Sequence, residues 1–323
     1  MKTVQRTFVC SLAVTLSLVV SCASPPKPPK SVKTIEFITN STSDFWKIAR
    51  KGCDKADAEL PDVTVAFKTT NTGTKEEQNG LIRRALDADE ADAIAISPID
   101  PVAQRTVINN AAKRALVVTQ DSDAADTDRA VYLGADNRAA GRQAGELMKK
   151  ALPQGGKIMV FVGKREVQNA KDRFEGLKES LQGSKVVVID LMTDEADVVN
   201  ARNNAYETLK KNPDIAGMVG LWSYNGPAIV KALRPEGKLG KIQIVCFDDE
   251  RDTLAAIKDG SIFGSVAQQP FEYGYQTIKT AAQILKGDRS VIPANKTIYI
   301  PTIVIQKNNV DDYIKKLDQL LAK

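Results

Sequence analysis

Residues 33–67 read KTIEFITNSTSDFWKIARKGCDKADAELPDVTVAF and set the architecture of the chain. The stretch opens with a β-branched run from Thr34 to Thr39 and continues through a polar loop into an amphipathic segment from Asp44 to Leu60. It closes with a second short run from Val63 to Phe67. Strand, helix and strand in this order form the repeating unit of a parallel sheet with helical crossovers. We therefore expect a doubly wound α/β fold.

The unit recurs along the chain in two sets. The first set continues with apolar runs at 93–97, 116–119 and 131–134, separated by helical stretches at 75–86 and 101–114. The second set begins near Lys157, after the turn sequence Pro153-Gln154-Gly155-Gly156, and has its runs at 158–162, 186–190, 216–221, 242–247 and 262–267. The sequence thus predicts two similar α/β lobes whose strand-end loops face each other.

The amino-acid composition limits the functions that this protein could have. The hydrophobic fraction of 43% and the charged fraction of 26% are typical of a globular protein, and 323 residues are enough for two domains. The formal net charge of +5 is too small to indicate a nucleic-acid partner. The chain has no histidine, the commonest general base and metal ligand, so we expect no metal and no cofactor. We interpret Cys53 and Cys246 as buried small hydrophobes rather than a disulfide.

The chain begins with a secretory pattern. Lys2 and Arg6 precede an apolar run from Phe8 to Val20, which is shorter than the roughly 20 residues that a membrane-spanning helix needs. We expect residues 1–21 to be a signal peptide. The sequence Val19-Val20-Ser21-Cys22 resembles the lipobox of bacterial lipoproteins, which implies a lipid anchor on Cys22. Cleavage by ordinary signal peptidase is the alternative.

Residues 22–32 contain four prolines and two lysines, and they have no large apolar side chain. Proline favours extended polyproline II, at about 3.1 Å per residue. We interpret this stretch as a semi-rigid tether between the membrane and the folded body.

From about residue 33 to 306 the chain resembles the ribose/galactose-type periplasmic binding proteins, the type I sugar-binding partners of ABC importers. The stretches Trp222-Ser223-Tyr224-Asn225-Gly226-Pro227 and Val245-Cys246-Phe247-Asp248 are similar to a glucose-binding subgroup. The resemblance implies two Rossmann-like, doubly wound lobes joined by a three-segment hinge, with crossovers near Ala135, Gln268 and Asn295.

The resemblance also implies how the chain divides. The N-terminal lobe would comprise 33–134 plus 269–296, and the C-terminal lobe 135–268 plus 297–323. The helix at 271–285 would return to the first lobe. The terminal helix at 310–322 would pack on the second.

In the first lobe the resemblance places Asn40 on a sugar hydroxyl and an aromatic ring against the sugar face. Either Phe45 or Trp46 supplies that ring while the other is core, and we favour Trp46 because its ring is larger. Asp121 matches the family aspartate that binds hydroxyls.

Two neighbours of Asp121 refine the expectation. Ribose binders carry an arginine where this chain has Ser122, which argues against ribose. Asp123 fits the glucose-like subgroup as a second acceptor, with a solvated turn residue as the alternative.

In the second lobe the resemblance puts Arg173 in the cleft as a cationic clamp that donates two parallel hydrogen bonds. Asn169 lies one helical turn earlier and shares its face. Asn225, Asp248 and Gln268 match further ligand contacts of the family.

We therefore expect a substrate-binding lipoprotein of an ABC-type sugar importer that holds a monosaccharide, with glucose or galactose favoured. It would be a monomer that contacts the ABC transporter permease and the membrane, and no nucleic acid. A receptor that signals to a membrane sensor is the main alternative. A repressor would need a DNA-binding helix pair where this chain has a leader and a tether, and a carbohydrate-active enzyme is disfavoured because each carboxylate already has a binding role.

Overall fold

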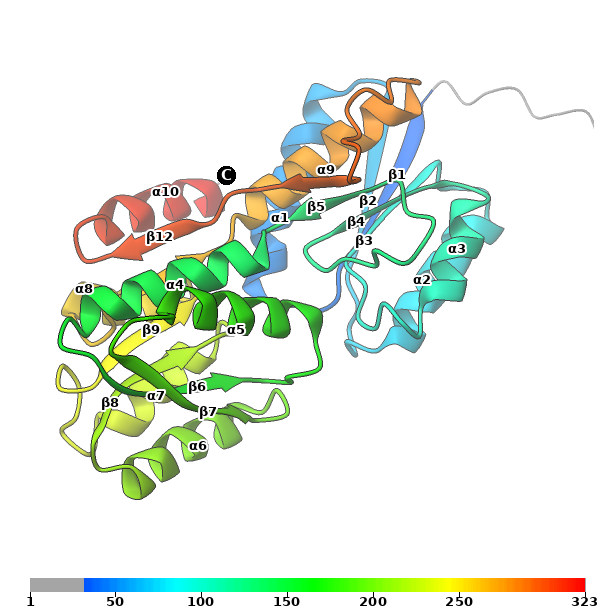
Figure 1. Cartoon of the computed structure of the whole chain (residues 1–323). Helices are drawn as coiled ribbons and strands as arrows, with labels where there is room; N and C mark the ends of the chain where they lie inside the picture. The colour runs from blue at the N-terminus through cyan, green and yellow to red at the C-terminus, as the bar shows by residue number, and fades with distance from the viewer. Residues whose placement is uncertain (1–31, 323) are drawn as a thin grey trace, which may run out of the picture. The chain divides into compact units, whose positions relative to one another are not determined.

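The computed structural model describes residues 32–322, which are built on two six-stranded sheets. Each sheet is flanked by helices, as Figure 1 shows. None of the helices in this described part combines the length and the apolar content that crossing a bilayer requires. The predicted signal peptide at 1–21, the predicted anchor Cys22 and nearly all of the tether lie outside the described residues.

The first sheet is entirely parallel, with the order β11-β5-β4-β3-β1-β2. Its strands are β1 (Lys33–Ile38), β2 (Val63–Lys68), β3 (Ala93–Ile96), β4 (Leu116–Gln120), β5 (Val131–Gly134) and β11 (Thr297–Tyr299). Its helices are α1 (Asp44–Glu59), α2 (Lys75–Asp87), α3 (Arg105–Ala112) and α9 (Pro270–Leu285). Separate apolar cores fill the α1/α9 side and the α2/α3 side of this sheet.

The second sheet repeats this plan, with the order β12-β10-β9-β8-β6-β7, and only β12 runs antiparallel to its neighbour. Its strands are β6 (Gly156–Val162), β7 (Val186–Thr193), β8 (Ile215–Gly220), β9 (Gln243–Phe247), β10 (Gly264–Ala267) and β12 (Ile303–Gln306). Its helices are α4 (Asn137–Ala151), α5 (Gln168–Leu181), α6 (Val198–Lys211), α7 (Asn225–Leu233), α8 (Arg251–Asp259) and α10 (Val310–Ala322). The two predicted α/β lobes are therefore confirmed.

The two late helices pack where the resemblance implied. The hydroxyl of Tyr275 in α9 donates to Glu59 of α1 at 2.7 Å, so this helix belongs to the first lobe. The terminal helix α10 forms ion pairs with α8 through Arg251 and Asp318 and through Lys258 and Asp311.

Cys53 and Cys246 are buried and free, which confirms their role as small apolar side chains.

The chain passes between the sheets three times, and the third passage differs from the expectation. The chain leaves the first sheet after Gly134 and returns to the first lobe after Ala267. Residues 297–299 were expected in the second lobe, but they pair with β5 as β11. The side chain of Ile300 is buried in the first core, and its N–H donates to the carbonyl of Gly134 at 2.8 Å. The passage therefore falls at residues 300–302 rather than near Asn295.

Candidate ligand-binding site

Asp121 and Asp248 stand at equivalent ends of the two sheets. Asp121 follows β4 and Asp248 follows β9, and these strands hold the same place in the two strand orders. Both residues have a left-handed backbone, with φ of 59° and 65°, which turns the chain out of the sheet. Ligand groups of doubly wound folds lie at this carboxyl edge of the strands.

The carboxylate of Asp121 lies among polar groups of the first lobe. Its Oδ2 accepts a hydrogen bond from the Ser97 hydroxyl at 2.7 Å and one from Asn40 Nδ2 at 3.2 Å. Burial raises the pKa of Asp121 to about 6; the Ser97 hydrogen bond and the charge of Arg173 lower it, and the charge of Asp248 raises it. Since Arg173 and Asp248 belong to the second lobe, charges of both lobes act on the Asp121 carboxylate.

Arg173 is held from two directions in the second lobe. Its Nε donates to Asn137 Oδ1 at 2.9 Å, and its Nη1 donates to the carbonyl of Leu221 at 2.7 Å. The guanidinium carbon lies 4.4 Å from the centre of the Phe247 ring, and the residue is only 3% exposed. Within residues 32–322, Nη2 makes no hydrogen bond, so this nitrogen remains able to donate to a ligand.

Close helix packing places Arg173. Asp136 caps the start of α4 by accepting from the N–H of Ala139 at 2.8 Å, which positions Asn137 in the first turn. A Cβ on Gly141 would lie 2.1 Å from the carbonyl oxygen of Arg173, so only glycine lets α4 approach α5 this closely. The backbone of α5 and the guanidinium are therefore both fixed by α4.

The expected division between Phe45 and Trp46 is reversed. Trp46 is 3% exposed within the first core, and its Nε1 donates to Asn40 Oδ1 at 2.9 Å and to the Ser41 hydroxyl at 3.0 Å. Phe45 is half-buried, with its ring centre 4.9 Å from that of Trp46. Trp46 therefore supports Asn40 from the core, and Phe45 is the ring with an accessible surface.

Asp248 is linked to the second crossover through an amide. Gln268 Nε2 donates to Asp248 Oδ1 at 2.9 Å, and Gln268 Oε1 accepts from the hydroxyl of Tyr273 at 3.1 Å. Gln268 is 7% exposed and Tyr273 is completely buried. The two predicted residues Asp248 and Gln268 are thus brought together, and Tyr273 is a partner that the sequence analysis did not identify.

Asn225, which the resemblance gives as a ligand contact, is buried and hydrogen-bonded within the second lobe. It is 1% exposed; its Oδ1 accepts from the N–H of Trp222 at 3.0 Å, and its Nδ2 donates to Asp194 Oδ2 at 2.9 Å. Tyr224 also donates its hydroxyl to Asp194, at 2.5 Å. Asp194, which the sequence analysis missed, is a buried acceptor after β7, and burial raises its pKa. Asn225 therefore holds the loop that carries Trp222.

Trp222 is a half-buried ring of the second lobe. Its Nε1 donates to Asn169 Oδ1 at 3.1 Å, so the predicted residue Asn169 orients the indole. A Cβ on Gly163 would lie 2.0 Å from Cζ3 of this ring, which shows that the indole packs directly on the Gly163 backbone. Trp222 was singled out in the sequence only as part of a family stretch, and its position makes it a candidate contact.

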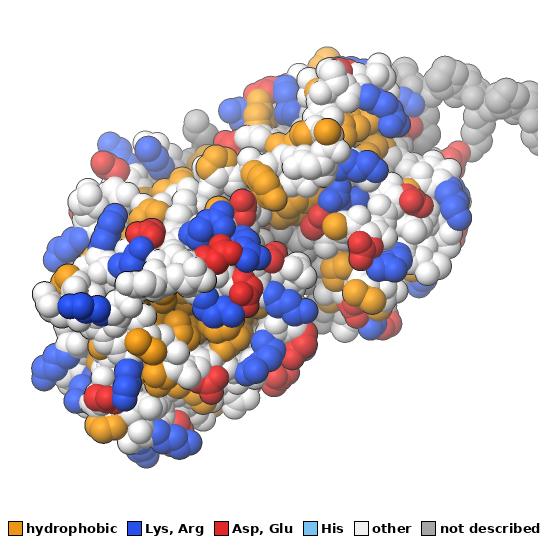
Figure 2. All heavy atoms as spheres, in the orientation of Figure 1, with side chains coloured by type: hydrophobic (Ala, Val, Ile, Leu, Met, Phe, Trp, Pro, Cys, Tyr) orange, Lys and Arg blue, Asp and Glu red, His pale blue; other side chains and the backbone are white. Residues whose placement is uncertain are grey.

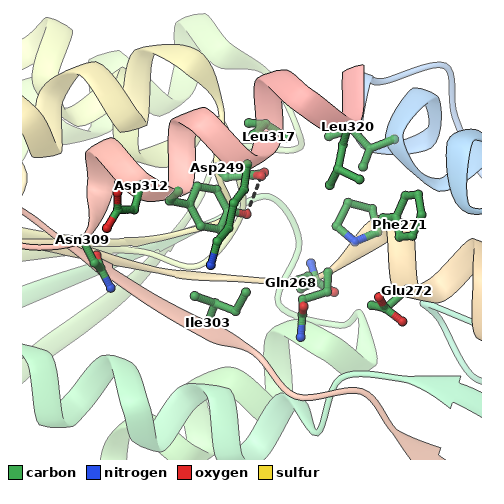
Figure 3. Close-up of a pocket in the computed structure, with 14 residues that line it drawn as sticks. Asp249, Gln268, Phe271, Glu272, Ile303, Asn309, Asp312, Leu317 and Leu320 are labelled. Atoms are coloured by element: carbon green, nitrogen blue, oxygen red, sulfur yellow. Dashed lines mark hydrogen bonds between the residues drawn. The ribbon is translucent and has the colours of Figure 1, made fainter. Parts of the chain in front are cut away.

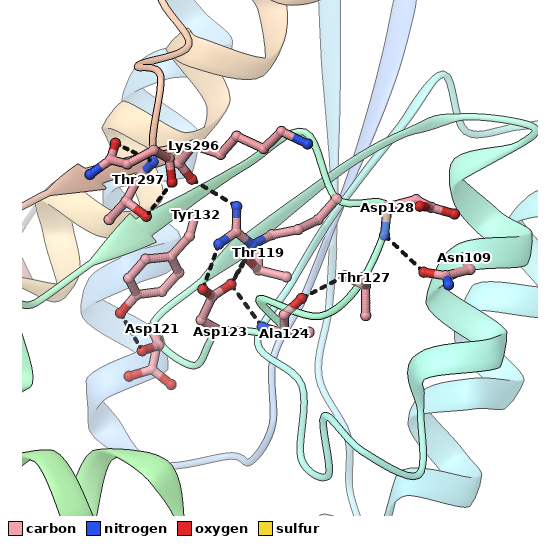
Figure 4. A network of polar contacts seen from close by, with 12 residues as sticks. Asn109, Thr119, Asp121, Asp123, Ala124, Thr127, Asp128, Tyr132, Lys296 and Thr297 are labelled. Atoms are coloured by element: carbon pink, nitrogen blue, oxygen red, sulfur yellow. Dashed lines mark hydrogen bonds and ion pairs between the residues drawn. The ribbon is translucent and has the colours of Figure 1, made fainter.

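Asp123 lies in a network of polar contacts at its own loop, as Figure 4 shows. Its two carboxylate oxygens pair with Nε and Nη2 of Arg129, at 2.5 and 2.6 Å. It also accepts from the Thr119 hydroxyl at 2.7 Å. Arg129 is 4% exposed and donates through Nη1 to the carbonyl of Lys296. A buried guanidinium in the same loop pairs with the carboxylate, so Asp123 has a structural role that neither expectation, a sugar acceptor or a solvated turn residue, included.

A cavity of about 400 Å³ adjoins the site through Gln268 but contains neither Asp121 nor Arg173 nor Asp248 (Figure 3). Apolar and polar side chains of α1, α9, β12 and α10 share its walls, with Asp249 and Tyr313 hydrogen-bonded at 2.8 Å on one side. Burial raises the pKa of Asp249 to about 6. This cavity is distinct from the charged cluster at the strand ends.

The fold and the cluster together define a two-lobed binding protein whose polar groups meet between two sets of strand ends. A model of the periplasmic binding protein domain matches residues 35–289, and the chain belongs to that family. The family and the relatives below consist of substrate-binding proteins rather than enzymes.

Three similar proteins illustrate the relationship. The ribose import binding protein RbsB of Salmonella typhimurium is 25% identical over 279 residues, covering 86% of this chain and 91% of the relative. The solved structure of a sugar ABC transporter sugar-binding protein from Bacillus halodurans is 27% identical with a TM-score of 0.79, covering 87% and 99%. An ABC transporter solute-binding protein from Burkholderia graminis, in complex with D-arabinose, is 26% identical with a TM-score of 0.81, covering 88% and 99%.

Proposed function

We propose that this protein binds a monosaccharide between its two lobes, and the convergence of Asp121, Asp248 and Arg173 carries the proposal. Each sugar hydroxyl both donates and accepts, so a buried sugar needs carboxylate acceptors and cationic donors together. Asp121 and Asp248 supply acceptors from opposite lobes, and the free Nη2 of Arg173 supplies a donor. The names of the relatives, which include ribose and D-arabinose binders, support a sugar ligand.

Two aromatic rings would cover the apolar faces of the sugar. Phe45 packs against Trp46 in the first lobe, and Trp222 lies next to Asn169 in the second. Sugar C–H faces pack on flat rings, and both rings keep accessible surface because they are only half-buried. The two rings therefore suit a ligand held from both sides.

We assign the sugar as a hexopyranose, with glucose or galactose first. The assignment depends on Ser122, which stands where ribose binders carry an arginine, and whose hydroxyl lies 3.5 Å from Asp121 Oδ2. A serine leaves more room and offers fewer fixed donors than an arginine, which suits a larger ring. Ribose and D-arabinose, the sugars named for relatives, form the competing outcome.

The protein, attached to the membrane through Cys22, would deliver the bound sugar to an ABC transporter permease. Closure would occur at the three passages between the sheets, near Ala135, Gln268 and residues 300–302. Small-angle scattering should then show a smaller radius of gyration with saturating sugar, and an unchanged radius would contradict closure.

Charges of both signs are interspersed on the face in Figure 2, which suits a protein partner better than nucleic acid.

A thermal-shift screen over pentoses, hexoses and inositols tests this proposal. A sugar present at 100 times its dissociation constant should add about 2.7 kcal/mol to the free energy of unfolding. The same sugar should be recovered chemically unchanged after incubation. If no monosaccharide raises the melting temperature, the proposed function is wrong.

A further inference from the structure

Gln268 connects the two lobes by its side chain as well as by its backbone. It lies in the second crossover, between β10 of the second lobe and α9 of the first. Its Nε2 donates to Asp248 of the second lobe, and its Oε1 accepts from Tyr273 of the first. The nitrogen and the oxygen of a single amide therefore form hydrogen bonds to residues of opposite lobes.

The hydroxyl of Tyr273 acts as a donor toward Gln268. The side chain is completely buried, and burial raises its pKa well above the ordinary tyrosine value, so the phenol keeps its proton. The phenol donates this proton to Gln268 Oε1, at 3.1 Å.

We infer that the Tyr273 hydroxyl is a specificity-determining positioning group, which fixes the orientation of the Gln268 amide beside Asp248; this inference rests on the proposed sugar site. The oxygen and the NH₂ of an amide have nearly the same shape, and only their hydrogen-bond partners select one orientation. A rotated amide would place Oε1 against the Asp248 carboxylate, so two acceptors would face each other. The Tyr273 hydroxyl adds to this preference, because it donates its proton to Oε1 in the observed orientation.

The consequence is a defined pattern at one sugar hydroxyl. In the fixed orientation, Asp248 and Gln268 offer that hydroxyl an acceptor and a donor at known places. A site built to pair a hydroxyl rejects an analogue that lacks it, because the protein groups are then left unpaired. Without the Tyr273 hydroxyl, one of the two partners that select the amide orientation is lost, and rejection of the analogue should weaken.

The change that tests this inference is Tyr273→Phe, which removes one oxygen and keeps the ring contact with Phe45, whose centre lies 5.9 Å away. The matched control is Tyr275→Phe on the same helix, which removes a hydroxyl that bonds to Glu59 at the surface. Calorimetry on the mature protein would use D-glucose, D-galactose, D-ribose and the monodeoxy analogues of D-glucose. Tyr273→Phe should weaken the preferred sugar about tenfold and reduce discrimination against one deoxy analogue by a similar factor. Tyr275→Phe should change neither quantity.

A double-variant experiment separates positioning from a general loss of structure. In a Gln268→Ala background, Tyr273→Phe should have no further effect on affinity, because the amide that it orients is gone. Equal weakening of all sugars, or an undiminished effect in that background, would overturn the inference while leaving the proposed function intact. If the parent binds none of these sugars, both fail.

A second variant covers the case in which Tyr273→Phe does not fold. Gln268→Glu still accepts from the Tyr273 hydroxyl but presents an acceptor to Asp248 in place of the Nε2 donor. It should fold like the parent and bind the preferred sugar at least tenfold more weakly. Unchanged affinity would show that the orientation of this amide does not matter and would overturn the inference.

Discussion

The backbone carbonyls of Asp121 and Asp248 are both held by hydroxyls of the strand next to their own. The carbonyl of Asp121 accepts from Tyr132 of β5 at 2.9 Å, and that of Asp248 accepts from Ser265 of β10 at 2.6 Å. The N–H of each aspartate also donates to the same neighbouring strand at 3.0 Å. A left-handed backbone outside glycine costs about 1 kcal/mol or more, and these paired hydrogen bonds offset that cost at both positions. The two lobes therefore present their carboxylates by the same local device.

Asp121→Asn should weaken sugar binding and stabilise the sugar-free protein above pH 6. Asparagine tolerates the left-handed backbone, so the variant keeps the side-chain shape and removes the charge and one acceptor oxygen. The pKa of Asp121 is raised to about 6 by burial, so its contribution to the free energy of unfolding is fully present below about pH 4 and is lost as pH rises through 6. The melting temperature of the parent should therefore fall more than that of the variant between pH 5 and pH 8.

Sugar affinity of the parent should show the opposite trend, because the ionised form is the hydroxyl acceptor. Affinity should fall as pH drops below about 6, whereas Asp121→Asn should be 30- to 1000-fold weaker at pH 8 and depend less on pH. Calorimetry at both pH values gives these quantities. Parallel pH profiles in variant and parent would exclude Asp121 from the site.

Phe45→Ala and Trp46→Ala should separate affinity from stability. Trp46 is a core residue at 3% exposure, so its removal should lower the free energy of unfolding by about 3 to 5 kcal/mol. Phe45→Ala should weaken sugar binding by about 1 kcal/mol, or roughly fivefold, with a smaller loss of stability. Urea denaturation and calorimetry on both variants provide the comparison. The reverse pattern would restore Trp46 as the ring that contacts the sugar.

Asp123→Ala should destabilise the protein and leave sugar affinity within about twofold of the parent. The change leaves Arg129 buried without its carboxylate, which costs about 3 kcal/mol, at the low end for buried pairs because the Asp123 side chain is 25% exposed. Asp126→Ala is the control, since it pairs with Arg105 at the surface and should cost less than about 1 kcal/mol. A large affinity loss with unchanged stability would make Asp123 a sugar contact after all.

Cys22→Ser should give a folded protein that no longer sediments with membranes, because the modified cysteine is the proposed anchor. The variant should keep the sugar affinity of the parent, since the site lies in residues 40–268. Fractionation of cells expressing each form, with detection of the protein in both fractions, is the measurement. Equal membrane association of the two forms would contradict lipidation at Cys22.

The alternation of strands and helices could be predicted from the sequence because its causes are local. Apolar runs of four to eight residues and amphipathic stretches depend on side-chain period, and the tandem lobes follow from their repetition. The third crossover was misplaced because residues 297–306 form one nearly continuous β-branched run. Pro301 divides that run, and β11 and β12 lie in different sheets on its two sides.

The site was predicted less completely. Which of several neighbouring side chains contacts the ligand depends on hydrogen-bond and ion-pair partners that lie far away in the sequence or in the same loop. Ring size favoured Trp46 as the sugar contact, yet its indole N–H needs a partner and finds Asn40 in the core. Asp123 is taken by Arg129, six residues later, a pairing that the charges of that loop could have suggested. Asn225 is paired with Asp194 after β7, and nothing in the local sequence of either residue indicates the other.

Isothermal titration calorimetry of the mature protein with D-glucose, D-galactose and D-ribose, each repeated on Asp248→Asn, tests the proposed function. We expect one hexose to bind with a stoichiometry of one and at least tenfold more tightly than ribose. Asp248→Asn should reduce that affinity by about 30-fold or more, since the Gln268 donor then faces a neutral amide and the sugar loses a carboxylate acceptor. Tighter binding of ribose, or equal binding of the best sugar by Asp248→Asn and the parent, would contradict the account.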